Sequence, residues 1–173
     1  MAELSNSVPH RLGRRALVHS ARTAVAAVVS LLVAHGLGLP EAYWATITTL
    51  IIMQSTLGAA LTVSEQRLAG TALGAALAAL LTTYFGSNTV VFGLGVFAIG
   101  LICVALHLGE AYRLASVTLA IVMLIGRTKP AWIVAAHRFV EVAVGIAVGL
   151  ALTAVWPDGE PTASPAPRAS PSE

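Results

Sequence analysis

The feature that most constrains this chain is a series of long apolar segments separated by brief polar linkers. Most of the segments approach the roughly 20 apolar residues that a helix needs to cross a bilayer. They are continuous rather than alternating in polarity, which favours helices over the strands of a membrane barrel. The sequence therefore predicts an all-α, polytopic membrane protein with about six transmembrane helices. We expect these helices at residues 15–35, 43–61, 68–85, 89–108, 112–126 and 132–156.

The composition excludes most other classes of protein. Of the 173 residues, 57% are hydrophobic and only 10% are charged, whereas about 25% of the residues of soluble domains are charged. The net charge of +2 is not gathered on a polar face, so we expect no nucleic-acid partner. Cys103 is the single cysteine, which leaves neither a disulfide nor a thiolate metal site. The sequence has no catalytic set and no nucleotide-binding motif, and we expect neither enzyme activity nor a cofactor or metal.

Three regions follow from the same pattern. Residues 1–14 form a basic segment, residues 15–156 form the membrane domain, and residues 157–173 form a Pro-, Ser- and Ala-rich tail that we expect to be disordered. Arginines are most frequent in the N-terminal segment and in the loops expected on its side of the membrane. Because basic loops face the cytoplasm, we expect both termini inside a bacterial inner membrane.

Two motifs occur twice in the same order. Glu41-Ala42-Tyr43 is matched 69 residues later by Glu110-Ala111-Tyr112, and Arg67-x-x-Gly70-Thr71-x-x-Gly74 is matched 71 residues later by Arg138-x-x-Glu141-Val142-x-x-Gly145. The motifs divide the membrane domain into halves at about residues 15–86 and 87–156. Each half would hold three helices, an odd number, which predicts a 3+3 inverted repeat of the kind found in secondary transporters. The similar composition of all membrane helices is the alternative explanation.

Small residues recur at intervals of four on the third and sixth segments. Such faces let two helix backbones approach closely, so that dispersion and weak polar contacts hold them together. The residues expected in this packing role are Gly70, Gly74, Gly145 and Gly149.

Several residues together resemble a known family. They are Tyr43-Trp44-Ala45, Gln54, Gly58 and the two motifs that begin at Arg67 and Arg138. They are similar to the fusaric acid resistance family, whose superfamily includes aromatic acid exporters and plant aluminium-activated malate transporters. The resemblance covers about residues 15–157. The chain departs from the family at Val142, where the second motif usually has Thr, and larger members carry a soluble domain after the sixth helix.

The resemblance implies a six-helix module in the lipid bilayer that moves small organic anions, including aromatic carboxylates. It also implies a homo-oligomer, a dimer or larger, because members of the family place their path between subunits or between duplicated halves. The alternative is a non-transporting scaffold or an accessory subunit of a larger efflux complex. A transporter should place arginines on a wet path, whereas a scaffold should hold all of them in closed pairs or near headgroups.

Ionisable and polar side chains within the apolar segments are the candidates for a substrate path, because a charge at a helix centre costs about 2.5–3.5 kcal/mol on insertion. Arg22 would either act as a cation on the substrate path or extend its side chain to the lipid headgroups. Arg67, expected in a linker, and Arg138, three residues before Glu141, would serve as helix clamps or as positive collars for carboxylates. The full set of candidates is Arg22, Tyr43, Trp44, Thr48, Gln54, Arg67, Arg138 and Glu141.

Overall fold

The computed structural model describes residues 7–54, 56–125 and 129–156, with side chains from residue 16 onward. Within these ranges the chain is helical and contains no strand, so the predicted all-α fold is confirmed. The helices are α1 (Ser7–Gly36), α2 (Tyr43–Met53), α3 (Leu57–Phe85), α4 (Thr89–Ala105), α5 (Ala111–Leu124) and α6 (Ala131–Val155). The disorder predicted for residues 157–173 concerns a segment outside the described residues.

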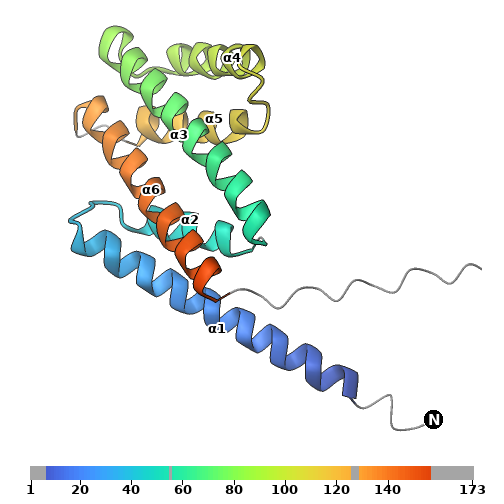
Figure 1. The fold of residues 1–173 in the computed structure, drawn as a ribbon. Helices are drawn as coiled ribbons and strands as arrows, with labels where there is room; N and C mark the ends of the chain where they lie inside the picture. Colours follow the sequence, from blue (N-terminus) through green and yellow to red (C-terminus); the bar gives the residue numbers. More distant parts are fainter. Residues whose placement is uncertain (1–6, 55, 126–128, 157–173) are drawn as a thin grey trace, which may run out of the picture.

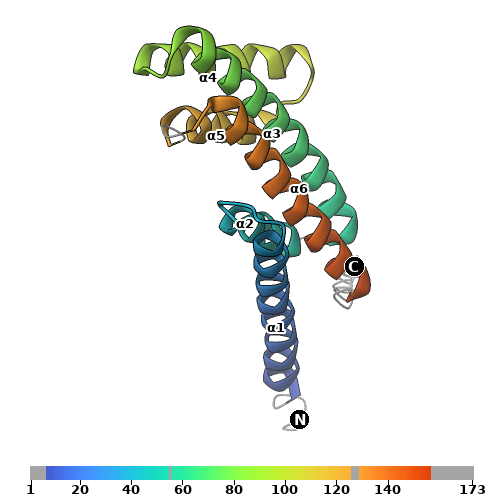
Figure 2. The same ribbon diagram turned by 90° about the vertical axis from the view of Figure 1, so that its left-hand side faces the viewer.

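The two long helices α3 and α6 pack along each other at the centre of the molecule (Figure 1). The pair α1 and α2 lies at one end of this central pair, and α4 and α5 lie at the other, as the rotated view also shows (Figure 2). Each central helix also packs on a short helix of the other half of the chain. α3 packs on α5, and α6 packs on α2.

Three helical segments are long and apolar enough to cross a membrane: residues Ala16–Gly36 of α1, the whole of α3 and the whole of α6. The other helices, α2, α4 and α5, have 11, 17 and 14 residues. At the usual rise per residue these are roughly 16, 26 and 21 Å long, whereas a bilayer core is about 30 Å thick. In the described ranges the predicted number of helices is confirmed, and these helices divide into three candidate membrane spans and three shorter helices.

The boundary between the second and third helices differs from the prediction. α2 ends at Met53 rather than at residue 61, and α3 begins at Leu57 rather than at residue 68. The polar stretch 62–67 predicts a linker, yet it contains no Gly or Pro. Polarity alone does not break a helix, so this stretch continues as part of α3. Arg67 consequently lies about three turns inside α3 rather than in a loop.

The helix ends follow local chemistry where the sequence supplies it. α1 ends at a left-handed glycine, Gly38 (φ 69°), and the next N–H, that of Leu39, donates to the carbonyl of Ala34 at 3.1 Å. This is the hydrogen bond of a Schellman motif, which satisfies a carbonyl at the helix end. At the start of α4, the side chain of Asn88 accepts the N–H of Val91 at 2.9 Å, as an N-cap residue should.

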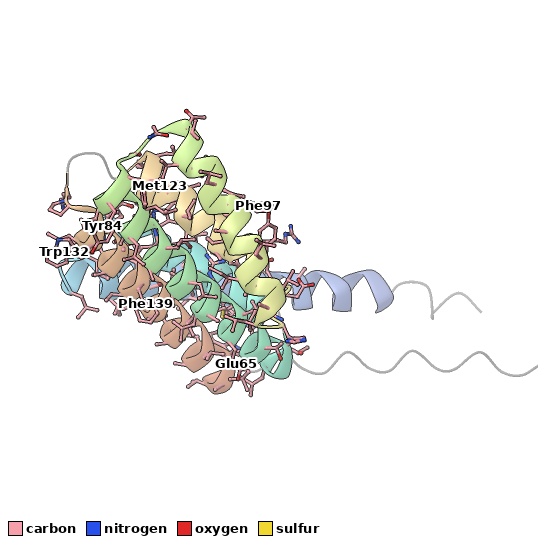
Figure 3. The ribbon with its side chains drawn as sticks, turned by 90° about the horizontal axis from the view of Figure 1, so that it is seen from above. Glu65, Tyr84, Phe97, Met123, Trp132 and Phe139 are labelled. Atoms are coloured by element: carbon pink, nitrogen blue, oxygen red, sulfur yellow. The ribbon has the colours of Figure 1, made fainter. Side chains whose placement is uncertain are left out.

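The interior and the outer surface of the bundle are both largely apolar. Met123 is buried beside α4, whereas Tyr84, Phe97 and Trp132 point outward and are more than half exposed (Figure 3). Soluble proteins rarely expose so many large apolar side chains, and lipid tails are the environment that suits them. Together with the three long apolar helices, this surface supports a membrane location.

Buried hydroxyl groups connect the first, second and sixth helices. Thr49 Oγ1 on α2 lies 2.8 Å from Ser30 Oγ on α1 and 2.9 Å from the carbonyl oxygen of Gly145 on α6. Both hydroxyl-bearing side chains are fully buried. Hydrogen bonds of this kind add modest but specific stabilisation between membrane helices, typically about 0.6 kcal/mol each. They fix the position of α2 between its two long neighbours.

Candidate functional site

Arg138 joins α6 to the residue just before α2. Its Nη2 donates to Glu41 Oε2 at 3.2 Å, and its Nη1 donates to Glu141 Oε2 at 3.4 Å. Glu141, one turn further along α6, also accepts the backbone N–H of Glu41 at 3.1 Å. A buried charge requires a partner of opposite sign and hydrogen bonds to the remaining polar atoms. With a side chain only 3% exposed, Arg138 therefore acts as a clamp between α6 and the start of α2.

Trp44 covers this ion-pair cluster. Its ring centroid lies 4.0 Å from Cζ of Arg138, a cation–π contact, and its Nε1 donates to Glu41 Oε2 at 3.1 Å. The neighbouring Tyr43 ring is 5.5 Å from it, at an angle of 41°. These contacts fix the plane of the indole between α2 and α6.

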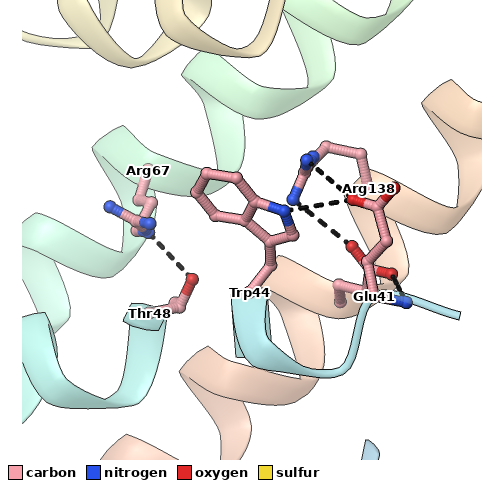
Figure 4. A network of polar contacts seen from close by, with 6 residues as sticks. Glu41, Trp44, Thr48, Arg67 and Arg138 are labelled. Atoms are coloured by element: carbon pink, nitrogen blue, oxygen red, sulfur yellow. Dashed lines mark hydrogen bonds and ion pairs between the residues drawn. The ribbon is translucent and has the colours of Figure 1, made fainter. Parts of the chain in front are cut away.

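Arg67 is buried without a carboxylate. Its side chain is on α3, and its Nε donates to Thr48 Oγ1 of α2 at 3.2 Å (Figure 4). Arg67 is 8% exposed and Thr48 is fully buried. Among the residues that the structure describes, no carboxylate oxygen lies within 4.0 Å of the Arg67 guanidinium. Within the described ranges, the guanidinium of Arg67 is therefore a buried cation without a carboxylate partner.

Arg67 and Arg138 line one cavity of about 210 Å³ between α2, α3, α5 and α6. The two arginines, with Thr71 and Thr118, supply its polar wall. The remaining wall is apolar, apart from the edge of Trp44. Figure 4 shows the indole of Trp44 between the two guanidinium groups. A cavity of mainly apolar walls with a few convergent polar groups is the usual form of a small-molecule site.

Arg22 lies outside this cavity and has a structural environment. Its side chain, on α1, is 1% exposed and donates to the carbonyls of Trp156 and Met53, the latter at 3.4 Å. Met53 is the last residue of α2, and Trp156 follows the last residue of α6. Helix C-termini carry partial negative charge and unpaired carbonyls. Arg22 therefore caps two helices at once, rather than extending to headgroups or lining the cavity.

The structure brings together five of the predicted path residues and separates others. Arg67, Thr48, Trp44, Arg138 and Glu141 form the connected site, and Tyr43 contacts it through Trp44. Gln54 is exposed just after the last residue of α2, where its backbone N–H closes the helix end, and it is not part of the site.

The four predicted packing glycines lie against helices of the opposite half. A Cβ atom at Gly70 would be 2.7 Å from the carbonyl oxygen of Ala111, and Gly74 also faces α5. A Cβ atom at Gly145 would overlap the carbonyl oxygen of Ala45, and Gly149 also faces α2. Since a glycine leaves room for the partner backbone, these positions permit the close contacts α3–α5 and α6–α2.

Glu41 is the site residue that the sequence reasoning missed. It lies in the loop before α2, outside any apolar segment, so a search for charges within spans passes over it. The repeat contained a signal, because Glu41 opens the repeated Glu-Ala-Tyr motif. Its ion pair with Arg138 becomes visible only once α6 is seen to pack on α2.

One comparison with known proteins gives a match. The model of a family described as fusaric acid resistance protein-like matches residues 25–152, which include the whole site. No curated protein and no solved structure matches the chain.

Proposed function

This chain belongs to the fusaric acid resistance protein-like family, a family of membrane transporters rather than enzymes, and from that premise we propose that it moves small organic anions across the membrane through the cavity between Arg67 and Arg138. The proposed location is a bacterial inner membrane, with several copies of the chain assembled as a homo-oligomer.

The buried, acid-free guanidinium of Arg67 is the observation that carries the proposal. A cation within a spanning helix is costly, and no described carboxylate balances the charge of Arg67. An incoming carboxylate supplies the missing negative charge and accepts two parallel N–H bonds from the guanidinium. Thr48 holds Nε, so the two terminal nitrogens remain to bind the ligand.

The rest of the cavity suits the carbon skeleton of such an anion. The aliphatic walls from α2 and α5 exclude water, and Trp44 offers an aromatic surface at the boundary. Apolar walls favour an organic anion over chloride or phosphate, because they cannot replace a hydration shell. We therefore assign the organic part of the substrate to the α2–α5 wall and its carboxylate to Arg67.

The scaffold hypothesis requires that every buried arginine be held in a closed structural contact. Arg138, with two carboxylates, and Arg22, with two helix ends, meet this requirement with their terminal nitrogens, although Nε of Arg138 is buried without a hydrogen bond in the described part of the chain. Arg67 does not. Among the arginines that the structure describes, this exception favours the transport hypothesis.

The short helices support the homo-oligomer. α2 and α5 are well below the thickness of a bilayer core. Membrane proteins accommodate short apolar segments by thinning the bilayer or by associating with further helices. Neighbouring copies would supply such helices, and chemical cross-linking in native membranes tests this part of the proposal.

The orientation with both termini in the cytoplasm is also part of the proposal. Arg67 no longer counts toward the cytoplasmic loops, because it lies inside α3. The basic N-terminal residues still favour the same orientation. Labelling of cysteines introduced at Ser87 and Ser164 tests it, since only Ser87→Cys should react with an impermeant reagent added outside.

Flux measurements in proteoliposomes test the function itself. Purified protein is compared with empty vesicles for efflux of benzoate, malate and benzenesulfonate, and benzyltrimethylammonium serves as a cation of similar size. We expect anion efflux above the empty-vesicle rate, and loss of that efflux in Arg67→Ala. Arg113→Ala, which removes an exposed arginine of α5, is the matched control and should retain efflux. Anion efflux equal to that of empty vesicles would contradict the proposal.

A further inference from the structure

The helices α1 and α4 end in the same turn, 69 residues apart. Gly38 (φ 69°) and His107 (φ 56°) both take the left-handed conformation, and in each case the next N–H closes the turn. The bonds are Leu39 N–H to the Ala34 carbonyl (3.1 Å) and Leu108 N–H to the Cys103 carbonyl (2.8 Å). A left-handed backbone is uncommon for a residue other than glycine. Its occurrence at His107 indicates that the surrounding architecture imposes the turn. A glutamate follows each turn, Glu41 before α2 and Glu110 before α5.

Each of these glutamates lies beside the arginine-bearing helix of the opposite half. Glu41 forms its ion pair with Arg138 on α6. Next to Glu110, the carbonyl of Ala111 packs against Gly70 on α3. Arg67 lies one turn before Gly70 on the same helix. The fold therefore brings the start of α5, which Glu110 precedes, beside the part of α3 that carries Arg67.

The two arginines nevertheless differ in their partners. Arg138 binds Glu41, whereas Arg67 is turned toward Thr48 and Glu110 is exposed. The cavity next to Arg138 has about 80 Å³ and is lined by Glu41 and His137. The corresponding cavity, lined by Gln66 and Glu110, has about 270 Å³. The side with the ion pair is thus the narrower one.

We propose that Glu110 is the carboxylate that binds Arg67 in a second conformation, in which Arg138 releases Glu41 and the wider side closes. The inference rests on the proposed function, since the cavity that the two arginines share is the path for the anion. In Figure 1 the loop before α2 and the loop before α5 lie on opposite sides of the molecule. Alternate ion pairs at the two sides give access to the cavity from one side at a time.

Competition for Arg67 couples this exchange to the release of the anion. In the conformation described here, Arg67 is available to a substrate carboxylate. When Glu110 binds Arg67 in place of the substrate carboxylate, the anion loses its main partner. It then leaves the cavity past Glu41. The two carboxylates bind the same guanidinium through equivalent hydrogen bonds, so neither state is favoured by a large margin.

Cross-linking between cysteines beside the two glutamates tests the inference without measuring transport. In a Cys103→Ala background, one variant carries Pro40→Cys and His137→Cys, which line the narrow cavity. The other carries Gly109→Cys and Gln66→Cys, which line the wide cavity. These substitutions leave both arginines and all acids in place. Each pair is treated with a short bifunctional thiol reagent in membrane vesicles, and the cross-linking rate is measured.

Each pair is then combined with Glu41→Gln, Glu110→Gln or the control Glu65→Gln, which neutralises an exposed acid of α3. Glu41→Gln should raise the cross-linking rate of the 66/109 pair, by at most about ten-fold, because the loss of one charged hydrogen bond changes the equilibrium constant between the two conformations by about that factor. Glu110→Gln should lower that rate, and Glu65→Gln should change neither pair. The inference is overturned if Glu41→Gln leaves the 66/109 rate unchanged, or if Glu110→Gln behaves as Glu65→Gln does.

Anion efflux from the same variants separates this inference from the proposed function. Glu110→Gln should slow efflux and Glu110→Asp should restore it, because the shorter acid keeps the charge. Efflux by the unsubstituted protein together with unchanged cross-linking rates in both glutamine variants overturns the exchange of ion pairs alone. The expected cross-linking changes without any anion efflux overturn the transport function instead.

Discussion

Arg138 and Glu141 lie one turn apart on α6, and their side chains form an ion pair of 3.4 Å while each is at most 3% exposed. Removal of Arg138 leaves Glu141 as an uncompensated buried charge. We expect Arg138→Met to lower the free energy of unfolding by about 3–5 kcal/mol. The double variant Arg138→Met/Glu141→Met should recover most of the loss, since it removes both charges. Unfolding in mixed detergent micelles measures both values, and equal stability of Arg138→Met and the unsubstituted protein would refute the assignment.

Gly145 is pressed against the backbone of α2. A Cβ atom there would overlap the carbonyl oxygen of Ala45, and a backbone atom cannot move aside as a side chain can. We expect Gly145→Ala to cost about 1–3 kcal/mol, as overpacking does. Gly93→Ala is the matched control, because nothing lies within 4 Å of a Cβ at that position of α4. It should be neutral or slightly stabilising. Thermal unfolding in detergent measures the stability of both variants.

Arg22 should affect stability without affecting the ligand. Arg22→Met keeps most of the apolar stem but removes the hydrogen bonds to the helix ends at Met53 and Trp156. Leaving the buried carbonyl of Met53 and the part-buried carbonyl of Trp156 unpaired should cost about 1–3 kcal/mol. The anion dissociation constant, measured by calorimetry below the unfolding temperature, should stay within about two-fold of the unsubstituted value. A large loss of affinity with intact stability would place Arg22 on the path instead.

Thr48 orients the guanidinium of Arg67 and should influence ligand affinity through it. Thr48→Val keeps the shape and removes the acceptor of the Arg67 Nε–H bond. We expect the anion dissociation constant to rise about ten-fold, the equivalent of one hydrogen bond to a charged group. Thr48→Ser should restore the affinity. Thr62→Val, at an exposed position of the same helix as Arg67, serves as the control and should leave the anion dissociation constant unchanged.

The sequence predicted the helical membrane fold, because hydropathy responds to the bilayer and not to the details of packing. It placed the end of α1 correctly at Gly36–Pro40, where glycine and proline mark the break. It misplaced the start of α3, because a polar stretch without Gly or Pro was interpreted as a linker. The repeat indicated the correct boundary, since the counterpart of Arg67 is Arg138, which was expected within a helix.

Part of the site could not be predicted from the sequence. Arg67 and Arg138 were both candidates, yet their roles differ because Glu41, from a loop, reaches only one of them. Which helix packs on which determines that difference, and hydropathy carries no such information. The two halves show matching helix pairings and matching turns, features that favour the inverted repeat, which stays a prediction.

The position of Arg67 three turns inside α3 has an electrical consequence. A charge that moves within the membrane does work against the transmembrane voltage, up to about 2.3 kcal/mol per elementary charge for each 100 mV if it crosses the whole field. Arginines in surface loops would feel almost none of this. A guanidinium carried on a spanning helix couples its own displacement, and that of the anion it holds, to the voltage of the living cell.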